Sequence, residues 1–189
     1  MSRIRFLWNF AKNPRQIGSI TPSSKWLCKR LLQAANLTDC ECVVEYGPGT
    51  ACLTRKILAD LSPGAKLIAF EINKDFVEVL KRELCHPAFF LTDESAEKVE
   101  GTLRTFGFEG ADYIFSGLPF TTMPPSLRER ILLSTNRALK PGGKFIIYQY
   151  SLYLLKTLNR IFDNVQISFE LRNIPPAFCF VCTKREGKT

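Results

Sequence analysis

The chain has 189 residues, 46% of them hydrophobic, which suits one domain with a sizeable core and argues against a disordered protein. No apolar run approaches the roughly 20 residues that span a bilayer, so we expect no transmembrane helix, and the charged N-terminus does not read as a secretory signal. Lysine and arginine number 26 against 18 acidic residues, a net charge of +8, which favours an anionic partner: nucleic acid or an anionic membrane face.

The pattern of residues 2–13 predicts a short basic amphipathic helix. Its apolar positions at helical spacing are Ile4, Leu7, Trp8 and Ala11, and the polar positions opposite are Arg5, Asn9 and Lys12. Such a helix suits the headgroup boundary of a membrane, so we expect residues 1–24 to form a membrane-binding helix and a lid segment. The same periodicity would also fit a helix docked on the protein's own core, with a plain connector after it.

Residues 43–58 have the order of a strand, a glycine-rich turn and a helix. Val43 and Val44 lead into Glu45, and the turn that follows contains Gly47 and Gly49. Glycines let the backbone turn sharply and let a ligand lie against bare main chain. Taken alone, such a turn more often closes an αβ unit than binds a nucleotide.

A second apolar run, residues 67–70, ends in Glu71, 22 residues after Gly49. An acidic side chain at the tip of the second strand is where a pair of ribose hydroxyls would be held. Ala51 stands where a dinucleotide-binding fingerprint has its third glycine, and Glu45 precedes the turn. Glu45-x-Gly47-x-Gly49 with Glu71 resembles the first two motifs of class I S-adenosylmethionine-dependent methyltransferases. The resemblance implies a Rossmann-like fold that binds this cofactor across the first two strand tips.

Strands and helices alternate along the rest of the chain. We predict strands at residues 43–46, 67–70, 88–91, 112–115, 144–150, 165–171 and 177–183. We predict helices after the caps Ser23 and Ser24 and at residues 54–58, 73–84, 99–106, 126–139 and 152–162, with a turn at residues 140–143. The last two strands should pair antiparallel, because the link between them, which contains Ile174, Pro175 and Pro176, is short. The expected fold is one α/β domain, residues 1–189, with a mostly parallel seven-stranded sheet and helices on both faces.

The third predicted strand leads into residues 92–96, where related enzymes place a polar or acidic residue against the adenine amino group. Asp93 and Glu94 are both candidates, with Ser95 beside them. A helix N-terminus that carries favourable negative charge would explain the same residues.

The seven cysteines are an odd number scattered through predicted core segments, so we expect buried reduced thiols. Cys179 and Cys182 have the spacing of a metal or redox motif, but residues three apart on a strand point to opposite faces. With His86 as the single histidine, we expect no metal site.

Residues 116–120, Ser-Gly-Leu-Pro-Phe, follow the fourth predicted strand. They resemble the Asn-Leu-Pro-Tyr or Asn-Pro-Pro-Tyr motif with which amino-methyltransferases, including the ribosomal RNA adenine dimethylases, hold a target nitrogen. Ser116 stands in place of the Asn, so the amide that would accept from an adenine amino group is missing. We also expect no helical domain of the kind those enzymes append, since the sequence given ends just after the predicted hairpin. RNA or DNA adenine N6-methylation is therefore the alternative function.

A closer resemblance covers nearly the whole chain and rests on residues 13–24, 45–50, 116–119 and 172–177. These segments resemble the bacterial phospholipid N-methyltransferases. The resemblance implies stepwise methylation of phosphatidylethanolamine towards phosphatidylcholine, with S-adenosylmethionine as cofactor. It implies a cytoplasmic enzyme, peripheral on the inner face of the cytoplasmic membrane, that binds an anionic membrane surface through its N-terminal helix. We expect a monomer with a phospholipid substrate and without a nucleic-acid partner.

The predicted site has three groups of residues. The cofactor-binding candidates are Glu45, Tyr46, Gly47, Gly49, Thr50, Glu71, Ile72, Glu94, Ser95 and Ser116. The catalytic candidates are Ser116, Gly117, Leu118, Pro119 and Tyr150. The substrate-binding candidates are Ile20, Thr21, Ser23, Phe120, Tyr148, Tyr150 and Arg172.

Two chemical arguments support the substrate group. Methylated ammonium ions sit well against aromatic faces, so we expect Phe120, Tyr148 and Tyr150 to surround the amine, although core packing would also explain these rings. Arg172 is the candidate for the lipid phosphate, because a guanidinium can grip a phosphate with two bonds. A solvated strand end would also explain Arg172.

Overall fold

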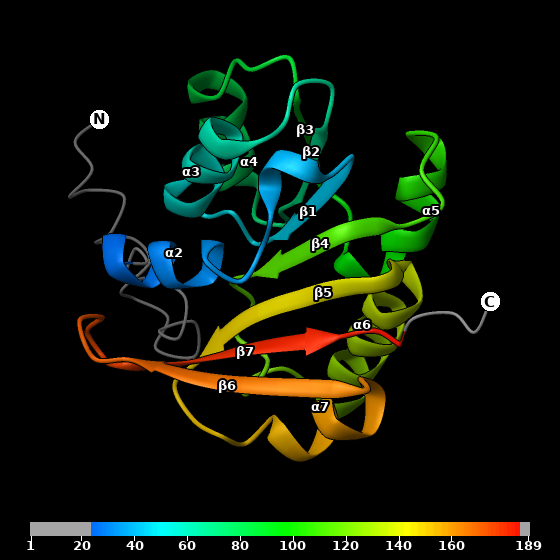
Figure 1. Cartoon of the computed structure of the whole chain (residues 1–189). Helices are drawn as coiled ribbons and strands as arrows, with labels where there is room; N and C mark the ends of the chain where they lie inside the picture. The colour runs from blue at the N-terminus through cyan, green and yellow to red at the C-terminus, as the bar shows by residue number, and fades with distance from the viewer. Residues whose placement is uncertain (1–23, 186–189) are drawn as a thin grey trace.

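The computed structural model describes residues 24–185, which form a seven-stranded sheet flanked by helices (Figure 1). The strands are β1 (Cys42–Tyr46), β2 (Lys66–Phe70), β3 (Phe89–Thr92), β4 (Ala111–Ser116), β5 (Leu139–Gln149), β6 (Asn164–Glu170) and β7 (Ala177–Thr183). Their order across the sheet is β3-β2-β1-β4-β5-β7-β6. The pairs among β1 to β5 are parallel, whereas β7 pairs antiparallel with β5 and with β6. The predicted mostly parallel sheet with a terminal antiparallel hairpin is confirmed.

Helices lie on both faces of this sheet, as predicted. They are α2 (Lys25–Leu32), α3 (Cys52–Asp60), α4 (Lys74–Glu83), α5 (Val99–Thr105), α6 (Pro125–Ala138) and α7 (Leu155–Ile161), with short 3-10 turns η2 (Leu37–Asp39) and η3 (Ala96–Lys98). Ser24 caps α2, its side chain accepting the N–H of Leu27. The predicted membrane helix and lid, with Ile20, Thr21 and Ser23, lie outside the described residues. Within residues 24–185, no helix is long and apolar enough to cross a membrane.

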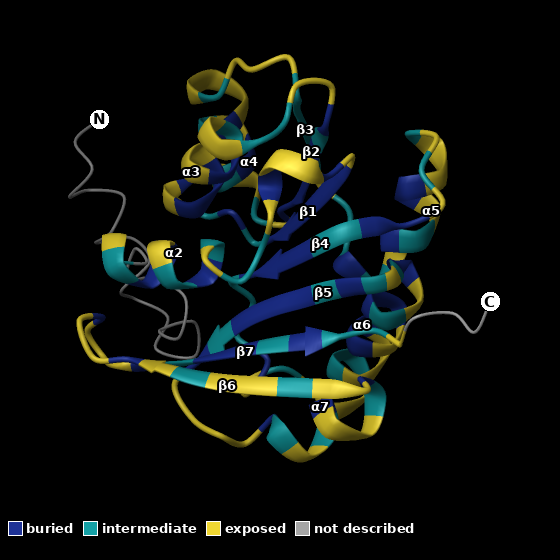
Figure 2. Cartoon of the chain, viewed as in Figure 1, coloured by how far each residue is buried: buried dark blue, intermediate teal, exposed yellow. Residues whose placement is uncertain are grey.

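The sheet separates two hydrophobic cores, because successive side chains of a strand point to opposite faces. Val44, Ile114 and Phe145 pack with α5, α6 and α7, whereas Val43 and Ile146 pack with α2 and α3. Figure 2 shows the consequence: β1 is buried throughout, and β4 and β5 are largely buried in their second halves, while the outer faces of the helices are exposed. The central strands are thereby held on both sides, which fixes the positions of the loops that follow them.

The cysteines follow the same alternation. Cys179 lies in the core beneath α2 and Cys182 in the core beneath α6, so their predicted divergence is confirmed. All seven cysteines are free, but Cys52 and Cys85 are exposed, so the expectation of buried thiols holds for the other five. Among the residues that the structure describes, no group of three or more His, Cys, Asp or Glu side chains is arranged to hold a metal ion.

The strand β5 begins earlier than predicted. Leu139 already pairs with Ala111 of β4, and the register then shifts before Lys144 pairs with Tyr113. The expected turn at residues 140–143 is therefore an irregularity within the strand ladder. Gly143 makes it possible, since a Cβ there would lie 2.9 Å from the carbonyl oxygen of Lys140.

Phe145→Ala should lower the free energy of unfolding by about 3–5 kcal/mol. The Phe145 side chain is fully buried, and its ring centroid lies 5.7 Å from that of Phe162 and 6.2 Å from that of Phe120. Phe169→Ala on the edge strand β6 is the control and should cost less than about 1 kcal/mol, because Phe169 is exposed. Urea unfolding followed by circular dichroism measures both, and equal losses would contradict the placement of the core.

Candidate cofactor and acceptor site

The carboxyl ends of the parallel strands meet at one edge of the sheet, toward which the arrowheads of β4 and β5 point in Figure 1. Tyr46, which ends β1, pairs with Phe70 of β2 and with Ser116 of β4, and Ser116 pairs with Ile147 of β5. The segments that follow these residues therefore begin side by side. Open α/β sheets bind their ligands at this edge.

The turns after β1 and β4 touch through their main chains. Gly47 donates its N–H to the Phe70 carbonyl at 2.8 Å, and Gly117 donates to the Tyr46 carbonyl at 2.9 Å. Gly47 has a φ of +68°, and a Cβ on Gly117 would lie 3.1 Å from the Gly47 carbonyl oxygen. Gly47 is thus required by its backbone conformation and Gly117 by the lack of space. The two glycines leave bare backbone where a ligand can lie close.

Glu71 joins the loop after β2 to the loop after β1. Its Oε1 atom accepts the N–H of Asn73 at 2.9 Å, and its Oε2 atom accepts the N–H of Gly49 at 3.3 Å. Burial raises the pKa of Glu71, and these backbone hydrogen bonds oppose the rise. A carboxylate oxygen that accepts one hydrogen bond keeps a lone pair for a ligand hydroxyl. The position therefore fits the expected ribose contact, and the side chain also fixes the glycine turn.

Glu45 is a buried carboxylate with an unused acceptor. It is 3% exposed, and its Oε2 atom accepts no hydrogen bond from the described residues. Burial raises the pKa of Glu45 to about 7; the nearby Thr54 hydroxyl opposes this rise, and the charge of Glu71 adds to it. A cationic or N–H donor of a ligand would satisfy the free oxygen. S-adenosylmethionine carries an ammonium and a sulfonium, so the residues at this edge fit that cofactor.

Three other cofactor candidates lie beside these carboxylates. The ring of Tyr46 is fully buried and packs edge-on against Phe70, with centroids 5.6 Å apart. The ring of Tyr46 therefore belongs to the core, and a cofactor contact of Tyr46 would be made by its main chain. Thr50 and Ile72 are exposed at the edge of the sheet.

Glu94 and Ser95 both stabilise the start of a helix, which matches the alternative explanation. The Glu94 carboxylate accepts from Lys98 Nζ at 3.0 Å and from Thr102 Oγ1 at 3.1 Å, and these contacts lower the pKa of Glu94. Ser95 caps η3, its Oγ atom accepting the N–H of Glu97 at 3.3 Å. Asp93, exposed just beyond β3, is left as the candidate for an adenine amino group.

The segment Ser116 to Pro119 is held in shape from two sides. The buried Ser116 Oγ accepts the N–H of Leu118 at 3.1 Å, so this hydroxyl supports the turn from within. Gln149, at the end of β5, donates from Nε2 to the Leu118 carbonyl at 3.0 Å. Gln149 was not found from the sequence, because one amide at a strand end forms no motif. Gly117, Leu118 and Pro119 are half-buried and face the edge.

Two of the three aromatic candidates lie together. The rings of Tyr148 and Tyr150 have centroids 6.0 Å apart and are nearly perpendicular, at 75°. The Tyr148 hydroxyl reaches the turn after β4, 3.8 Å from where a Cβ on Gly117 would lie. Phe120, in contrast, is fully buried and packs edge-on against Phe145. Phe120 therefore belongs to the core, and the two tyrosines are the candidates for contact with the amine.

Arg172 is already paired in the structure, and its contact with a lipid phosphate stays a prediction. Its Nε and Nη2 atoms lie 2.9 Å and 3.2 Å from the two carboxylate oxygens of Glu170, and its guanidinium stacks on the Trp26 ring at 4.1 Å. The guanidinium fork that would grip a lipid phosphate with two bonds is thus occupied by a carboxylate. Arg172 is nevertheless half-exposed, and one side of it faces solvent.

Asn173 lies beside the candidate amine contact, and the sequence analysis used it only within the resemblance at residues 172–177. It is buried, its Oδ1 atom accepts the N–H of Ser24 at 3.1 Å, and its Nδ2 atom donates to the Pro175 carbonyl at 2.7 Å. Burial raises the pKa of Tyr150, and the Asn173 side chain beside the hydroxyl partly offsets this. Asn173 therefore ties the start of α2 and the β6–β7 turn to the candidate amine contact.

Comparisons with known sequences point to methyltransferases. The family model described as ribosomal RNA adenine dimethylase matches residues 11–91. The ornithine lipid N-methyltransferase of Singulisphaera acidiphila is 31% identical over 179 residues, which are 94% of this chain and 93% of that protein. The ribosomal RNA small subunit methyltransferase A of a Synechococcus strain is 30% identical over 115 residues, which are 60% of this chain and 40% of that protein.

A solved structure gives the same fold. The precorrin-6y C5,15-methyltransferase from Geobacter metallireducens superposes with a TM-score of 0.62, covering 87% of this chain and 93% of that one. The sequence identity is 15%, so this likeness concerns the fold alone. It confirms the predicted Rossmann-like methyltransferase architecture.

Glu45→Gln should raise stability and weaken cofactor binding. Folding raises the pKa of Glu45 from 4.5 to about 7, so in this interval the folded protein holds a proton that the unfolded chain has lost. Stability of the wild type therefore falls as pH rises from about 4.5 to 7. The variant lacks this slope and should be the more stable at neutral pH and above, yet bind S-adenosylmethionine roughly tenfold more weakly.

Thermal unfolding of the ligand-free protein across this pH range and calorimetric titration with the cofactor measure the two effects. Glu78→Gln, the same change at an exposed position of α4, is the matched control. Identical pH slopes for wild type and Glu45→Gln would contradict the assignment of an ionisable group buried at this position.

The glycine turn, the two carboxylates at neighbouring strand tips and the sheet order all agree with these comparisons. The relative from Singulisphaera, at 31% identity, is covered over 93% of its length. The chain therefore belongs to the family of class I S-adenosylmethionine-dependent methyltransferases that includes this ornithine lipid N-methyltransferase, and S-adenosylmethionine is its cofactor.

Proposed function

We propose that the protein N-methylates the amine of a membrane lipid head group. The proposed acceptors are phosphatidylethanolamine and its mono- and dimethyl derivatives, so that the product series leads towards phosphatidylcholine. The main support for a lipid acceptor is the Singulisphaera relative, which is named for N-methylation of a lipid and matches 94% of this chain.

The surface around the site supports a lipid acceptor. Large hydrophobic side chains are exposed in the segment after β5, at Leu152 and Tyr153, and after β2 at Ile72. Leu152 and Tyr153 follow Tyr150 closely in the chain, and Ile72 follows β2 at the same carboxyl edge of the sheet. Apolar side chains gathered around an active-site edge suit an enzyme that takes its substrate from a lipid surface.

The proposed mechanism uses the geometry of two turns. S-adenosylmethionine supplies a methyl group on a sulfonium and leaves as a neutral thioether. The turn at Gly47 would hold the cofactor against bare main chain, and the free oxygen of Glu45 would accept from one of its donor groups. The turn at Gly117 and the rings of Tyr148 and Tyr150 hold the acceptor nitrogen in line. Orientation at a near-attack distance of around 3–3.5 Å supplies much of the rate in such transfers.

The tyrosines act as neutral aromatic rings in this scheme. Burial raises the pKa of Tyr150 further above neutrality, so its hydroxyl stays protonated and does not serve as the base. Ammonium and methylated ammonium groups are attracted to the faces of such rings. The incoming amine must lose its proton before transfer, because its pKa lies near 10, like that of lysine.

Ornithine lipid is a second candidate acceptor, favoured by the name of the Singulisphaera relative. The pairing of Arg172 with Glu170 also bears on this choice, because it occupies two of the guanidinium N–H donors that a lipid phosphate would need. An RNA adenine acceptor has weaker support, since the ribosomal RNA methyltransferase relative is matched over 40% of its own length.

Incubation with labelled S-adenosylmethionine should methylate phosphatidylethanolamine in vesicles. Thin-layer chromatography and mass spectrometry of the extracted lipids report the acceptor and the number of methyl groups. Parallel reactions with ornithine lipid vesicles and with unmethylated ribosomal RNA identify the other two acceptors. If the cofactor binds but no lipid is methylated, the proposed function is wrong.

Tyr150→Phe should retain most of the methyl transfer, whereas Tyr150→Leu should lower kcat/KM by roughly three- to thirtyfold. The phenylalanine keeps the ring face and loses the hydroxyl beside Asn173, and the leucine loses both. Affinity for S-adenosylmethionine, measured by calorimetry, should be the same in both variants. Equal activities of the two variants would show that the ring face of Tyr150 does not contact the amine.

A further inference from the structure

The turn between β6 and β7 lies at the same edge of the sheet as the candidate site. Because β7 is antiparallel to β5, Phe178 near the start of β7 pairs with Gln149 at the end of β5. Residues 171–176 therefore project where β5 ends, which Figure 1 shows beside the start of α2. The side chains at the tip of this turn have no role in the proposed methyl transfer.

Two aliphatic side chains stand exposed on this turn. Leu171 is 71% exposed and Ile174 is 81% exposed, the highest values among the large hydrophobic side chains that the structure describes. The backbone between them is held in place, since Asn173 is buried and bonded to Ser24 and Pro175. The turn thus presents two apolar side chains on a fixed support.

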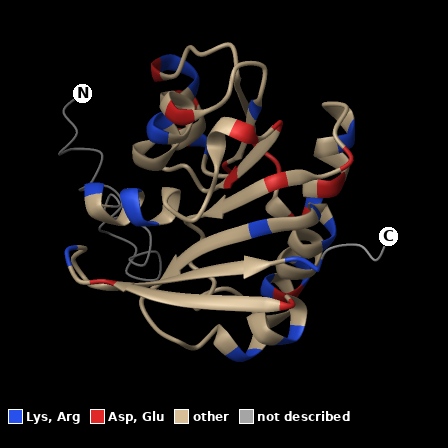
Figure 3. Cartoon of the chain, in the orientation of Figure 1, with Lys and Arg blue, Asp and Glu red and all other residues tan. Residues whose placement is uncertain are grey.

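Cationic side chains line two hollows between this turn, α2 and α3. A hollow of about 570 Å³ between α2 and α3 is lined by Lys25, Trp26, Lys29, Lys56 and Asp60, among others. A smaller hollow continues it to Arg30, Glu170 and Arg172. Five cations against two carboxylates leave an excess of three positive charges. Figure 3 shows these cations of α2 and of the turn on one side of the molecule.

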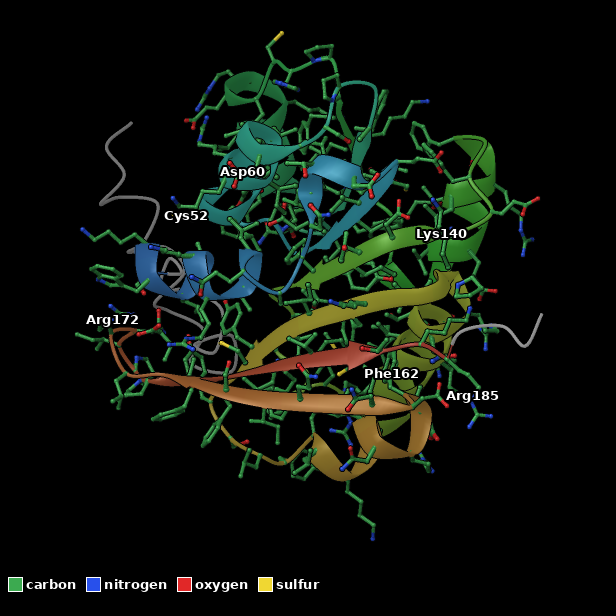
Figure 4. All side chains as sticks on the ribbon, in the orientation of Figure 1. Cys52, Asp60, Lys140, Phe162, Arg172 and Arg185 are labelled. Atoms are coloured by element: carbon green, nitrogen blue, oxygen red, sulfur yellow. The ribbon has the colours of Figure 1, made fainter. Side chains whose placement is uncertain are left out.

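Trp26 joins the basic hollow to the turn. Arg172 lies 4.1 Å from the centre of its ring, and the ammonium of Lys25 lies 5.1 Å from it. Glu170 holds both Arg30 and Arg172, each at 2.9 Å, so these guanidiniums are fixed. Figure 4 shows Arg172 at the turn beside α2. An aromatic ring with flanking cations is a combination typical of membrane interfaces.

We propose that the β6–β7 turn and the outer face of α2 dock on an anionic lipid membrane. Leu171 and Ile174 enter the boundary between head groups and acyl chains, Trp26 lies at the level of the head groups, and Lys25 and Lys29 face anionic lipids. This inference rests on the proposed function and names the surface by which the site edge meets the membrane. Cations alone would suit the phosphates of a nucleic acid equally well. The exposed aliphatic side chains beside them favour a lipid bilayer.

Docking through this surface would bring the candidate site to the acceptor lipid. The turn, α2 and the segment after β5 all border one edge, so docking there would turn the site toward the head groups. A lipid amine could then be methylated while its acyl chains stay in the bilayer. All residues of this contact belong to the part of the chain that the structure describes.

The test uses the full chain and vesicles of phosphatidylcholine, with or without phosphatidylglycerol, which contain no amine acceptor. Lys25→Gln/Lys29→Gln should weaken binding to the anionic vesicles by roughly 25-fold, about fivefold for each lysine. Leu171→Ser/Ile174→Ser should weaken it by about tenfold or more. Methylation of a short-chain, monomeric phosphatidylethanolamine should be unchanged in both variants.

Matched controls lie on other faces. Lys81→Gln/Lys156→Gln removes the same charge from α4 and α7, and Leu133→Ser removes an exposed leucine from α6; all should bind vesicles like the wild type. Thermal unfolding confirms that each variant is folded. Unchanged vesicle binding in the two test variants, or a loss equal to that of the controls, would overturn the docking surface.

RNA binding and methylation of short-chain lipid are two further measurements, and they test the docking surface separately from the proposed function. If the lysine variant loses affinity for an RNA oligonucleotide but not for vesicles, the surface binds nucleic acid and the docking proposal is wrong. A second outcome is that the test variants lose vesicle binding as expected while neither they nor the wild type methylates short-chain phosphatidylethanolamine. In that case the docking surface is supported and the proposed acceptor is wrong. If short-chain phosphatidylethanolamine is methylated but the test variants bind vesicles like the wild type, the proposed acceptor stands and the docking surface is wrong.

Discussion

The main-chain contact between the turns after β1 and β4 is the constraint on which the site depends. Gly117 donates to the carbonyl of Tyr46, and a side chain on Gly117 would collide with the Gly47 carbonyl oxygen. Because each turn leaves a strand buried between two helical layers, neither can move without disturbing the sheet. The turn after β1 and the proposed acceptor segment after β4 are therefore held in one fixed arrangement.

Two buried carboxylates show how differently such groups can be treated in one fold. Glu170 is bonded by Arg30 and Arg172, and these contacts lower its pKa to about 2. Glu45 has an oxygen without a partner among the described residues, and burial raises its pKa to about 7. The first carboxylate stabilises the join between α2 and the terminal hairpin. The second costs stability in the ligand-free protein, a pattern expected where a group is kept for a ligand.

The sequence by itself determined the architecture and the cofactor edge, because these depend on local patterns. Alternating βα units predict the sheet, and the short link between the last two strands predicts their antiparallel pairing. The positions of Gly47 and Gly117 after strands, and of Glu45 and Glu71 at strand ends, follow from the same reading. Spacing on a strand was also enough to separate Cys179 from its neighbour three residues on, since side chains alternate between faces.

Only the tertiary structure decided which side chains are available for function. The rings of Tyr46 and Phe120 are in the core because helices cover them, and a pattern of aromatic residues at strand tips does not contain that information. Arg172 is engaged by Glu170 and Trp26, and Asn173 is bonded to the start of α2, 149 residues away in the chain. Such partners meet through folding and not through sequence spacing. Local periodicity therefore specified the strands and turns, while long-range packing determined which polar groups are already satisfied and which stay open to a ligand.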